Sequence, residues 1–127
     1  MIWMITLHKG FVKSFLAGEK DIELRTRVPK ALHPGDILLV AQAGTHNKVV
    51  MSMSVMSVMK LPPAEMFKMH YKGIQLNYLA YNDYTKGHEW VYGIRVYDVK
   101  RMERELHTSD FGIKTAPQWF RMVKKGL

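Results

Sequence analysis

The densest group of ionisable side chains in this sequence lies between residues 18 and 25. The segment reads Gly-Glu-Lys-Asp-Ile-Glu-Leu-Arg, and the groups that could do chemistry are Lys20, Glu23 and Arg25. A desolvated ammonium group can act as a base, a carboxylate can relay protons, and a guanidinium can bind a phosphate through two parallel hydrogen bonds. The pattern indicates an anion-binding cleft or a catalytic site, and the alternative is an ordinary ion pair on a solvent-exposed strand.

This segment must be positioned by a strand. The alternation of residues 21–25 predicts a strand with Ile22 and Leu24 on one face and the charged residues on the other. Strict alternation places Lys20 on the Ile22 face. Lys20 can therefore meet Glu23 only if the chain bends just before the strand.

Two further regions carry candidate ligand-binding residues. His8 lies between an apolar segment at residues 2–7, which predicts a buried strand, and a helix predicted at residues 9–17. It could line a cleft or serve as a structural histidine. Near the end of the chain, Gln118 could hydrogen-bond to a base edge while Trp119 stacks on the base, although large aromatic side chains more often belong to a core.

The remaining segments predict more strands and two short helices. Strands are expected at residues 37–41, 49–58 and 90–99. A helix should open at Pro62-Pro63, run to about Tyr71 and end at Gly73, and residues 75–84 should add a further turn or two. These elements indicate one α+β domain whose strands curl into a small barrel.

Residues 49–58 contain a change of apolar parity. Met53 and Val55 alternate with serines, after which the apolar positions shift by one residue. This predicts that Met53 and Val55 face the interior while Ser52 and Ser54 do not, with a β-bulge between Val55 and Ser57.

Composition narrows the class of protein. The chain has 127 residues, 47% of them hydrophobic, which suits a single globular domain spanning residues 1–127. Its net charge of +8 favours a polyanion such as RNA as partner, although such a charge also simply maintains solubility. Residues 100–127 hold seven basic and three acidic side chains, so the excess is concentrated there.

Several classes of site lack support in the sequence. With no cysteine, disulfides, Cys-ligated metals and thiol nucleophiles drop out, and the six histidines show no metal-ligand spacing. No phosphate-binding loop, dinucleotide fingerprint or nucleophile elbow occurs. We therefore expect no metal and no cofactor. Without a signal peptide or membrane-spanning segment, we expect a cytoplasmic protein that does not engage membranes.

The order of these segments resembles the ASCH domain of the PUA-like superfamily. The resemblance rests on the G-x-K-x-x-E-x-R element formed by Gly18, Lys20, Glu23 and Arg25, on Pro34-Gly35-Asp36 before an apolar strand, and on Pro117-Gln118-Trp119. It implies a small mixed β-barrel with peripheral helices and a cleft lined by the element, in a superfamily whose better-known members bind RNA. Some small bacterial members are similar to amidohydrolases that deacetylate N4-acetylcytidine, and others are reported as ribonucleases. In those amidohydrolases a Thr stands where this chain has Glu23.

Three hypotheses for function follow. The first is an RNA- or modified-nucleoside-binding domain whose cleft holds Lys20, Glu23 and Arg25, with His8 and the Gln118-Trp119 segment nearby. The second is a small hydrolase in the same cleft, with Lys20 as base or nucleophile and Glu23 as proton relay. The third is an adaptor for partner proteins that the sequence does not identify.

Structural observations can separate these hypotheses. Burial of Lys20 would favour the enzyme, a basic groove from Arg25 toward the tail would favour RNA, and a bare apolar patch would favour the adaptor. If Lys20 and Arg25 contact only a ligand, their removal should weaken binding with little loss of thermal stability.

Overall fold

The computed structural model describes residues 1–124. Lys125, one of the seven basic residues counted in residues 100–127, lies outside the described residues. The elements in chain order are β1 (Ile2–Leu7), α1 (Lys9–Leu16), β2 (Ile22–Arg25), β3 (Ile37–Gln42), β4 (Lys48–Leu61), α2 (Pro63–Ile74), α3 (Tyr78–Thr85), β5 (Val91–His107), a 3-10 helix (Thr108–Phe111) and β6 (Arg121–Met122). Strands and helices combine in the α+β fold that the sequence predicts.

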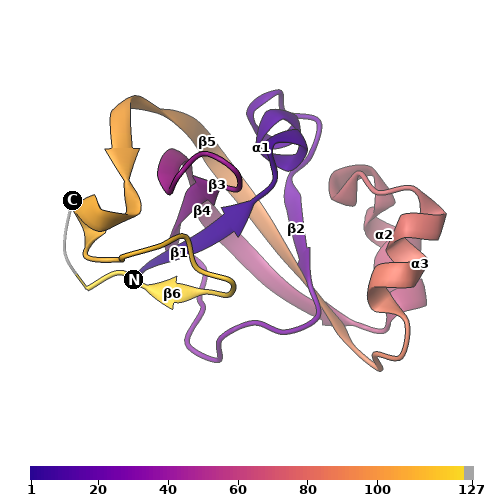
Figure 1. Cartoon of the computed structure of the whole chain (residues 1–127). Coiled ribbons are helices and arrows are strands. Elements are labelled where there is room, and N and C mark those ends of the chain that lie inside the picture. The colour runs from indigo at the N-terminus through magenta and orange to yellow at the C-terminus, as the bar shows by residue number, and fades with distance from the viewer. Residues whose placement is uncertain (125–127) are drawn as a thin grey trace.

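The six strands form one sheet with the order β2-β5-β4-β3-β1-β6. Strands β1 and β3 run parallel, whereas the other neighbouring pairs are antiparallel. The sheet curls into a half-barrel, with α2 and α3 together beside β2 and with the N-terminus and β6 toward the opposite end (Figure 1). The edge strand β2 therefore lies beside α2 and α3, and its place in the sheet positions the segment of residues 18–25.

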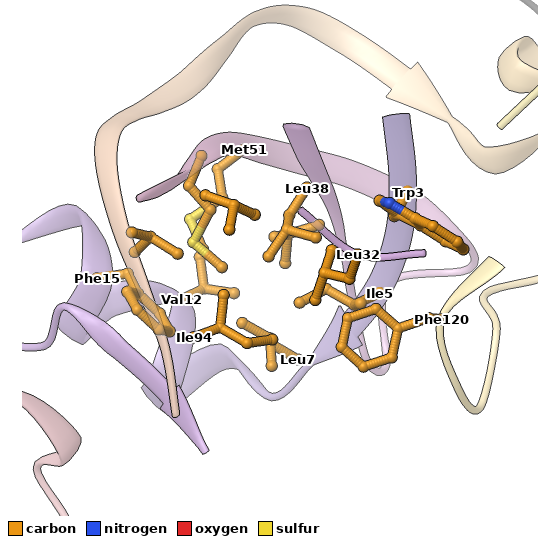
Figure 2. Packing of buried hydrophobic residues seen from close by; sticks show 14 residues of the cluster. Trp3, Ile5, Leu7, Val12, Phe15, Leu32, Leu38, Met51, Ile94 and Phe120 are labelled. Carbon is orange, nitrogen blue, oxygen red and sulfur yellow. The ribbon is translucent and has the colours of Figure 1, made fainter. Parts of the chain in front are cut away.

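The core explains why β1 and β3 are continuous apolar runs. Their residues are buried on both faces: Trp3 and Ile5 belong to one apolar cluster, and Met4 and Leu39 belong to a second. Phe120, from the chain end, packs in the same cluster as Ile5 (Figure 2). A strand covered on both sides needs apolar residues at every position, which removes the alternation seen in β2.

The predicted irregularity in β4 is confirmed. Met53 and Val55 are 1% and 0% exposed, whereas Ser52 and Ser54 are partly exposed. The register of β4 against β5 shifts between Val55 and Ser57. The shift lets the apolar residues of a 14-residue strand follow the curl of the sheet.

The predicted end of α2 at Gly73 is wrong. The helix includes Gly73 and ends after Ile74, and Gln75 adopts the left-handed conformation (φ 55°, ψ 41°) that closes it. Gly73 instead allows a close approach: a Cβ there would lie 2.2 Å from Asp21 Oδ1 and 3.0 Å from Ile22 Cδ1, so the Asp21 side chain would have to shift. Closeness of another chain segment, and not a positive φ, explains this glycine.

The predicted strand at residues 90–99 is too short. Strand β5 begins at Val91 and continues to His107, through a charged segment that shows no apolar alternation. Pairing with β4 supplies the stabilising contacts, including an ion pair of 2.6 Å between Lys48 Nζ and Glu105 Oε1. Asp98, with φ of 52°, marks an irregular point within the strand.

Candidate functional site

The two faces of β2 have different surroundings. Ile22 and Leu24 pack in an apolar cluster with Met66 of α2, as the alternation predicts. Glu23 and Arg25 line a pocket of about 350 Å³, which we call the motif pocket. One short strand thus holds a helix on one side and presents ionisable groups on the other.

Asp21 does not share the surface of Glu23. It precedes β2 and forms an ion pair of 2.8 Å between its Oδ2 and Arg95 Nη1. Both residues line a different cavity next to the end of α2. The expected grouping of Asp21 with Glu23 and Arg25 is therefore wrong, because the strand starts one residue later than the alternation.

The walls of the motif pocket come from four parts of the chain. Its apolar lining includes Leu7 from β1, Phe11 from α1, Leu24 from β2 and Leu76 before α3. The ionisable lining residues are His8, Lys20, Glu23 and Arg25. An apolar cavity with a few convergent polar groups, within the size range of roughly 300–1,000 Å³ found for small-molecule sites, is suited to an organic ligand with an anionic part.

A bend before β2 brings Lys20 to the motif pocket. Gly18 has φ of 76°, which a residue with a side chain rarely adopts, and the amides of Glu19 and Lys20 both donate to Ser14 O. The amide of Asp21 then donates to Gly73 O at 3.1 Å. Lys20 consequently lines the same pocket as Glu23, instead of following the Ile22 face that strict alternation would give it.

Lys20 is integrated into the fold. Its side chain is buried, its Nζ donates to Ile74 O, and its ammonium lies 5.1 Å and 5.4 Å from the ring centroids of Phe11 and Phe15. Burial lowers the pKa of Lys20, whereas the nearby carboxylate of Glu23 acts in the opposite direction. We therefore expect removal of Lys20 to lower stability as well as ligand binding, which differs from the expectation drawn from the sequence.

The ion pair between Glu23 and Arg25 is largely buried, so it is not the ordinary pair on a solvent-exposed strand that the sequence left as an alternative. Glu23 Oε2 accepts from Arg25 Nε at 2.6 Å, and the two side chains are only 7% and 14% exposed. The guanidinium also lies 5.0 Å from the ring centroid of Phe120. Among residues 1–124, no protein acceptor binds the two terminal nitrogens of Arg25. These nitrogens can therefore donate to a ligand.

His8 occupies the rim of the motif pocket. It is exposed and immediately precedes α1, and its side chain does not cap that helix. Its ring lies 6.5 Å from that of Phe11, centroid to centroid. At this position the imidazole can contact a ligand, and it does not stabilise the start of α1 by a side-chain hydrogen bond.

Gln118 and Trp119 lie at a second pocket, of about 590 Å³. Arg25 also lines it, whereas neither Gln118 nor Trp119 lines the motif pocket. The tail is held against β1 by a hydrogen bond of 2.7 Å from Thr6 Oγ1 to Pro117 O. The predicted site residues are thus divided between two neighbouring pockets that share Arg25.

Helix α3 and the residues just before it line the motif pocket, although the sequence pattern did not identify them. Ala80 and Tyr84 line the motif pocket with Leu76, and Tyr84 also lines the second pocket. Burial raises the pKa of the Tyr84 hydroxyl, which Arg25 partly opposes. The four-residue spacing of Ala80 and Tyr84 places these side chains on one helical face, and this is the signal that could have identified them.

Within residues 1–124, His, Asp and Glu side chains nowhere gather in a group of three that could hold a metal ion. No helix in this part of the chain is long and apolar enough to cross a membrane.

Comparisons with known proteins agree with the fold. The ASCH domain family matches residues 5–103. The crystal structure of ASCH from Zymomonas mobilis is similar at a TM-score of 0.86 and 17% identity, covering 98% of this chain and 88% of that one. A mutant form of that Zymomonas mobilis protein gives a TM-score of 0.87 at 17% identity, covering 98% and 91%. A hypothetical protein, PH0355, gives 0.58 at 17% identity, covering 80% and 100%. Among curated proteins, none matches the sequence.

Proposed function

Because this chain belongs to the ASCH domain family and has its PUA-like fold, we propose that it binds single-stranded RNA or a modified nucleoside in the motif pocket. The observation that carries this proposal is the placement of Arg25. Its guanidinium is held by Glu23 and Phe120 while its terminal nitrogens are free of protein acceptors within residues 1–124. A guanidinium fixed in this way is preorganised to bind a phosphate.

The remaining walls suit a nucleobase. Phe11, Leu24 and Leu76 offer apolar surface against which a flat ring can pack, and Glu23 and Lys20 offer an acceptor and a donor for the polar edge of a base. Recognition of this kind requires neither a metal ion nor a cofactor. The net charge of +8 assists encounter with a polyanion.

Removal of Arg25 tests the proposal. An eight-nucleotide RNA of random sequence, labelled with fluorescein, would be titrated against the Arg25→Ala variant. We expect affinity to fall at least about tenfold, equivalent to about 1.4 kcal/mol. Arg101→Ala removes the same charge from an exposed site at the far part of β5 and serves as control. Equal effects of the two variants would contradict a specific role for the motif pocket.

Salt dependence gives a second measurement. Each phosphate neutralised on a single strand releases roughly 0.7 counterions, so the affinity of the wild-type protein should fall steeply with added salt. The slope should be shallower in Arg25→Ala than in Arg101→Ala. Binding that is independent of salt would point to a neutral ligand, such as a free nucleoside, in the motif pocket.

Burial of Lys20 supports a hydrolase as second candidate. The lowered pKa of Lys20 makes its neutral amine more accessible, and the residue lines the motif pocket beside Glu23. In this alternative Lys20 is the base or nucleophile and Glu23 the proton relay. Release of acetate from N4-acetylcytidine and cleavage of the eight-nucleotide RNA would be measured for wild type and Glu23→Gln. Loss of turnover by about a hundredfold or more in Glu23→Gln would support the enzyme, and absence of turnover in the wild type would leave the binding function alone.

The adaptor hypothesis has a weaker basis. Helices α2 and α3 expose Met69, Tyr71, Tyr78 and Leu79. None of these four residues lines the motif pocket, so this surface gives no role to Lys20, Glu23 or Arg25.

A further inference from the structure

We propose that the second pocket binds the nucleotide adjacent to the one in the motif pocket, so that the ligand is a single-stranded oligonucleotide spanning both. This inference rests on the proposed function and extends it. It assigns a base-stacking role to Trp119 and a backbone-binding role to Arg25, which stands between the two pockets.

Contiguity of the two pockets is the first argument. Arg25 and Tyr84 line both of them, so the two pockets adjoin each other at these side chains. Glu23 binds Nε of Arg25, and the terminal nitrogens of this shared residue have no protein acceptor among residues 1–124. The phosphate that links two nucleotides would lie at this junction, where a guanidinium can donate two hydrogen bonds to it.

Charge is the second argument. The lining of the second pocket includes Arg25, Arg27 and His88, and none of its lining residues is acidic. The motif pocket, in contrast, contains the carboxylate of Glu23. A pocket with basic side chains and no carboxylate favours the more anionic part of an oligonucleotide.

The aromatic surface is the third argument. Trp119 is 37% exposed. The guanidinium of Arg27 lies over its ring, 4.7 Å from the centroid, and Phe120 makes a T-shaped contact with it at 5.5 Å between centroids. Its indole nitrogen donates to Arg27 O at 3.3 Å. An indole that is fixed yet exposed provides a stacking surface at small entropic cost, and Gln118 beside it offers an amide to the edge of a base.

A matched pair elsewhere on the surface provides the control. Trp90 is 41% exposed and has Lys60 Nζ at 5.0 Å from its ring, so it resembles the Trp119–Arg27 pair. It lines neither the motif pocket nor the second pocket. Trp119→Ala and Trp90→Ala therefore remove the same side chain from comparable exposure, and only the first should matter for RNA.

The experiment measures affinity for the fluorescein-labelled eight-nucleotide RNA of random sequence. We expect Trp119→Ala to weaken binding about tenfold, Arg27→Ala to weaken it by a smaller factor, and Trp119→Phe to restore most of the affinity because the phenyl ring still stacks. Trp90→Ala should stay within about twofold of wild type, as exposed residues outside the ligand site do not contribute stacking. If Trp119→Ala disturbs the packing of residues 117–120, Arg27→Ala still tests the second pocket, because Arg27 is exposed and its removal should leave the fold intact.

The outcomes separate this inference from the proposed function. If Arg25→Ala weakens binding while Trp119→Ala and Arg27→Ala behave like Trp90→Ala, the second pocket is not a nucleotide site and the motif pocket alone binds RNA. If Arg25→Ala has no effect, the proposed function fails, and the continuous site fails with it whatever Trp119→Ala does. Loss of affinity in both Arg25→Ala and Trp119→Ala, with rescue by Trp119→Phe, supports the continuous site.

Discussion

Two carboxylates are buried among residues 1–124, and their surroundings differ. Asp36 accepts hydrogen bonds from the Met1 ammonium, from Trp3 Nε1 at 3.0 Å and from the His33 amide at 2.9 Å. Glu23 accepts from Arg25 Nε and borders the motif pocket. The oxygens of Asp36 are occupied by the fold, whereas Glu23 retains an oxygen without a protein donor in this part of the chain. Burial alone therefore does not distinguish the two carboxylates, whereas hydrogen-bonding capacity left unused beside a pocket does.

The largest effect is expected on stability, when the buried carboxylate of Asp36 is removed. Asp36→Ala leaves the buried indole of Trp3 and the His33 amide without an acceptor and should lower the free energy of unfolding by about 3 kcal/mol. Urea unfolding measures the change. RNA affinity of the folded variant should equal that of wild type, and a matching loss of affinity would show that the two carboxylates are not separate in role.

Lys20 is expected to contribute both to stability and to ligand binding, and Lys20→Met tests both. Lys20→Met keeps an unbranched stem beside Phe11 and Phe15 but removes the donor to Ile74 O and the charge beside Glu23. We expect RNA affinity to fall at least tenfold, about 1.4 kcal/mol. Stability should also fall, by about 1 kcal/mol. Lys13→Met, on an exposed site of α1, removes an equal charge and should change neither quantity.

The stability contributed by the Asp36 carboxylate should decrease in acid. Burial tends to raise the pKa of Asp36, yet the hydrogen bonds from Met1, His33 and Trp3 hold that pKa below the ordinary carboxyl value. The stability that Asp36 contributes is therefore present above the pKa of an unfolded Asp and is lost as the pH falls through the lowered folded pKa. Urea unfolding at decreasing pH should show a shallower acid limb in Asp36→Asn than in wild type. Superimposable acid limbs would contradict this role.

The smallest expected effect concerns Glu23. In Glu23→Gln the amide oxygen can still accept from Arg25 Nε, so stability should change by less than about 1 kcal/mol. Removing the negative charge should strengthen RNA binding about twofold to threefold, because a bound phosphate no longer faces a carboxylate. A marked loss of RNA affinity would mean that the ligand donates to Glu23 more strongly than its phosphates are repelled.

Local patterns were sufficient for much of the fold. Alternation located β2 and the interior face of β4, and the parity change located the bulge at Val55. The charged half of β5 was not predictable in this way, because residues 100–107 are held by pairing with β4, and only Met102 and Leu106 of this segment pack against the core. Gly73 was misread for a similar reason, since the close approach of Asp21 is visible only in three dimensions.

The candidate site was predictable in part. The spacing of Lys20, Glu23 and Arg25 identified the groups that line the motif pocket, but alternation placed Lys20 on the wrong face because it could not include the bend at Gly18. Tyr84 was missed because its element lies far along the chain from the motif. The division of Gln118 and Trp119 into a second pocket depends on how the tail packs against β1, which no local pattern encodes.

The pairing of β2 with residues 92–95 of β5 has a consequence for biosynthesis. During synthesis from the N-terminus, the lysine, glutamate and arginine of the motif emerge early, yet their strand has no neighbour until β5 has left the ribosome. The wall contributed by α3 also comes from this later portion. Contacts between segments so distant in sequence form slowly and late. The motif pocket therefore stays incomplete while only the first half of the chain has been made, and it assembles only when most of the protein has left the ribosome.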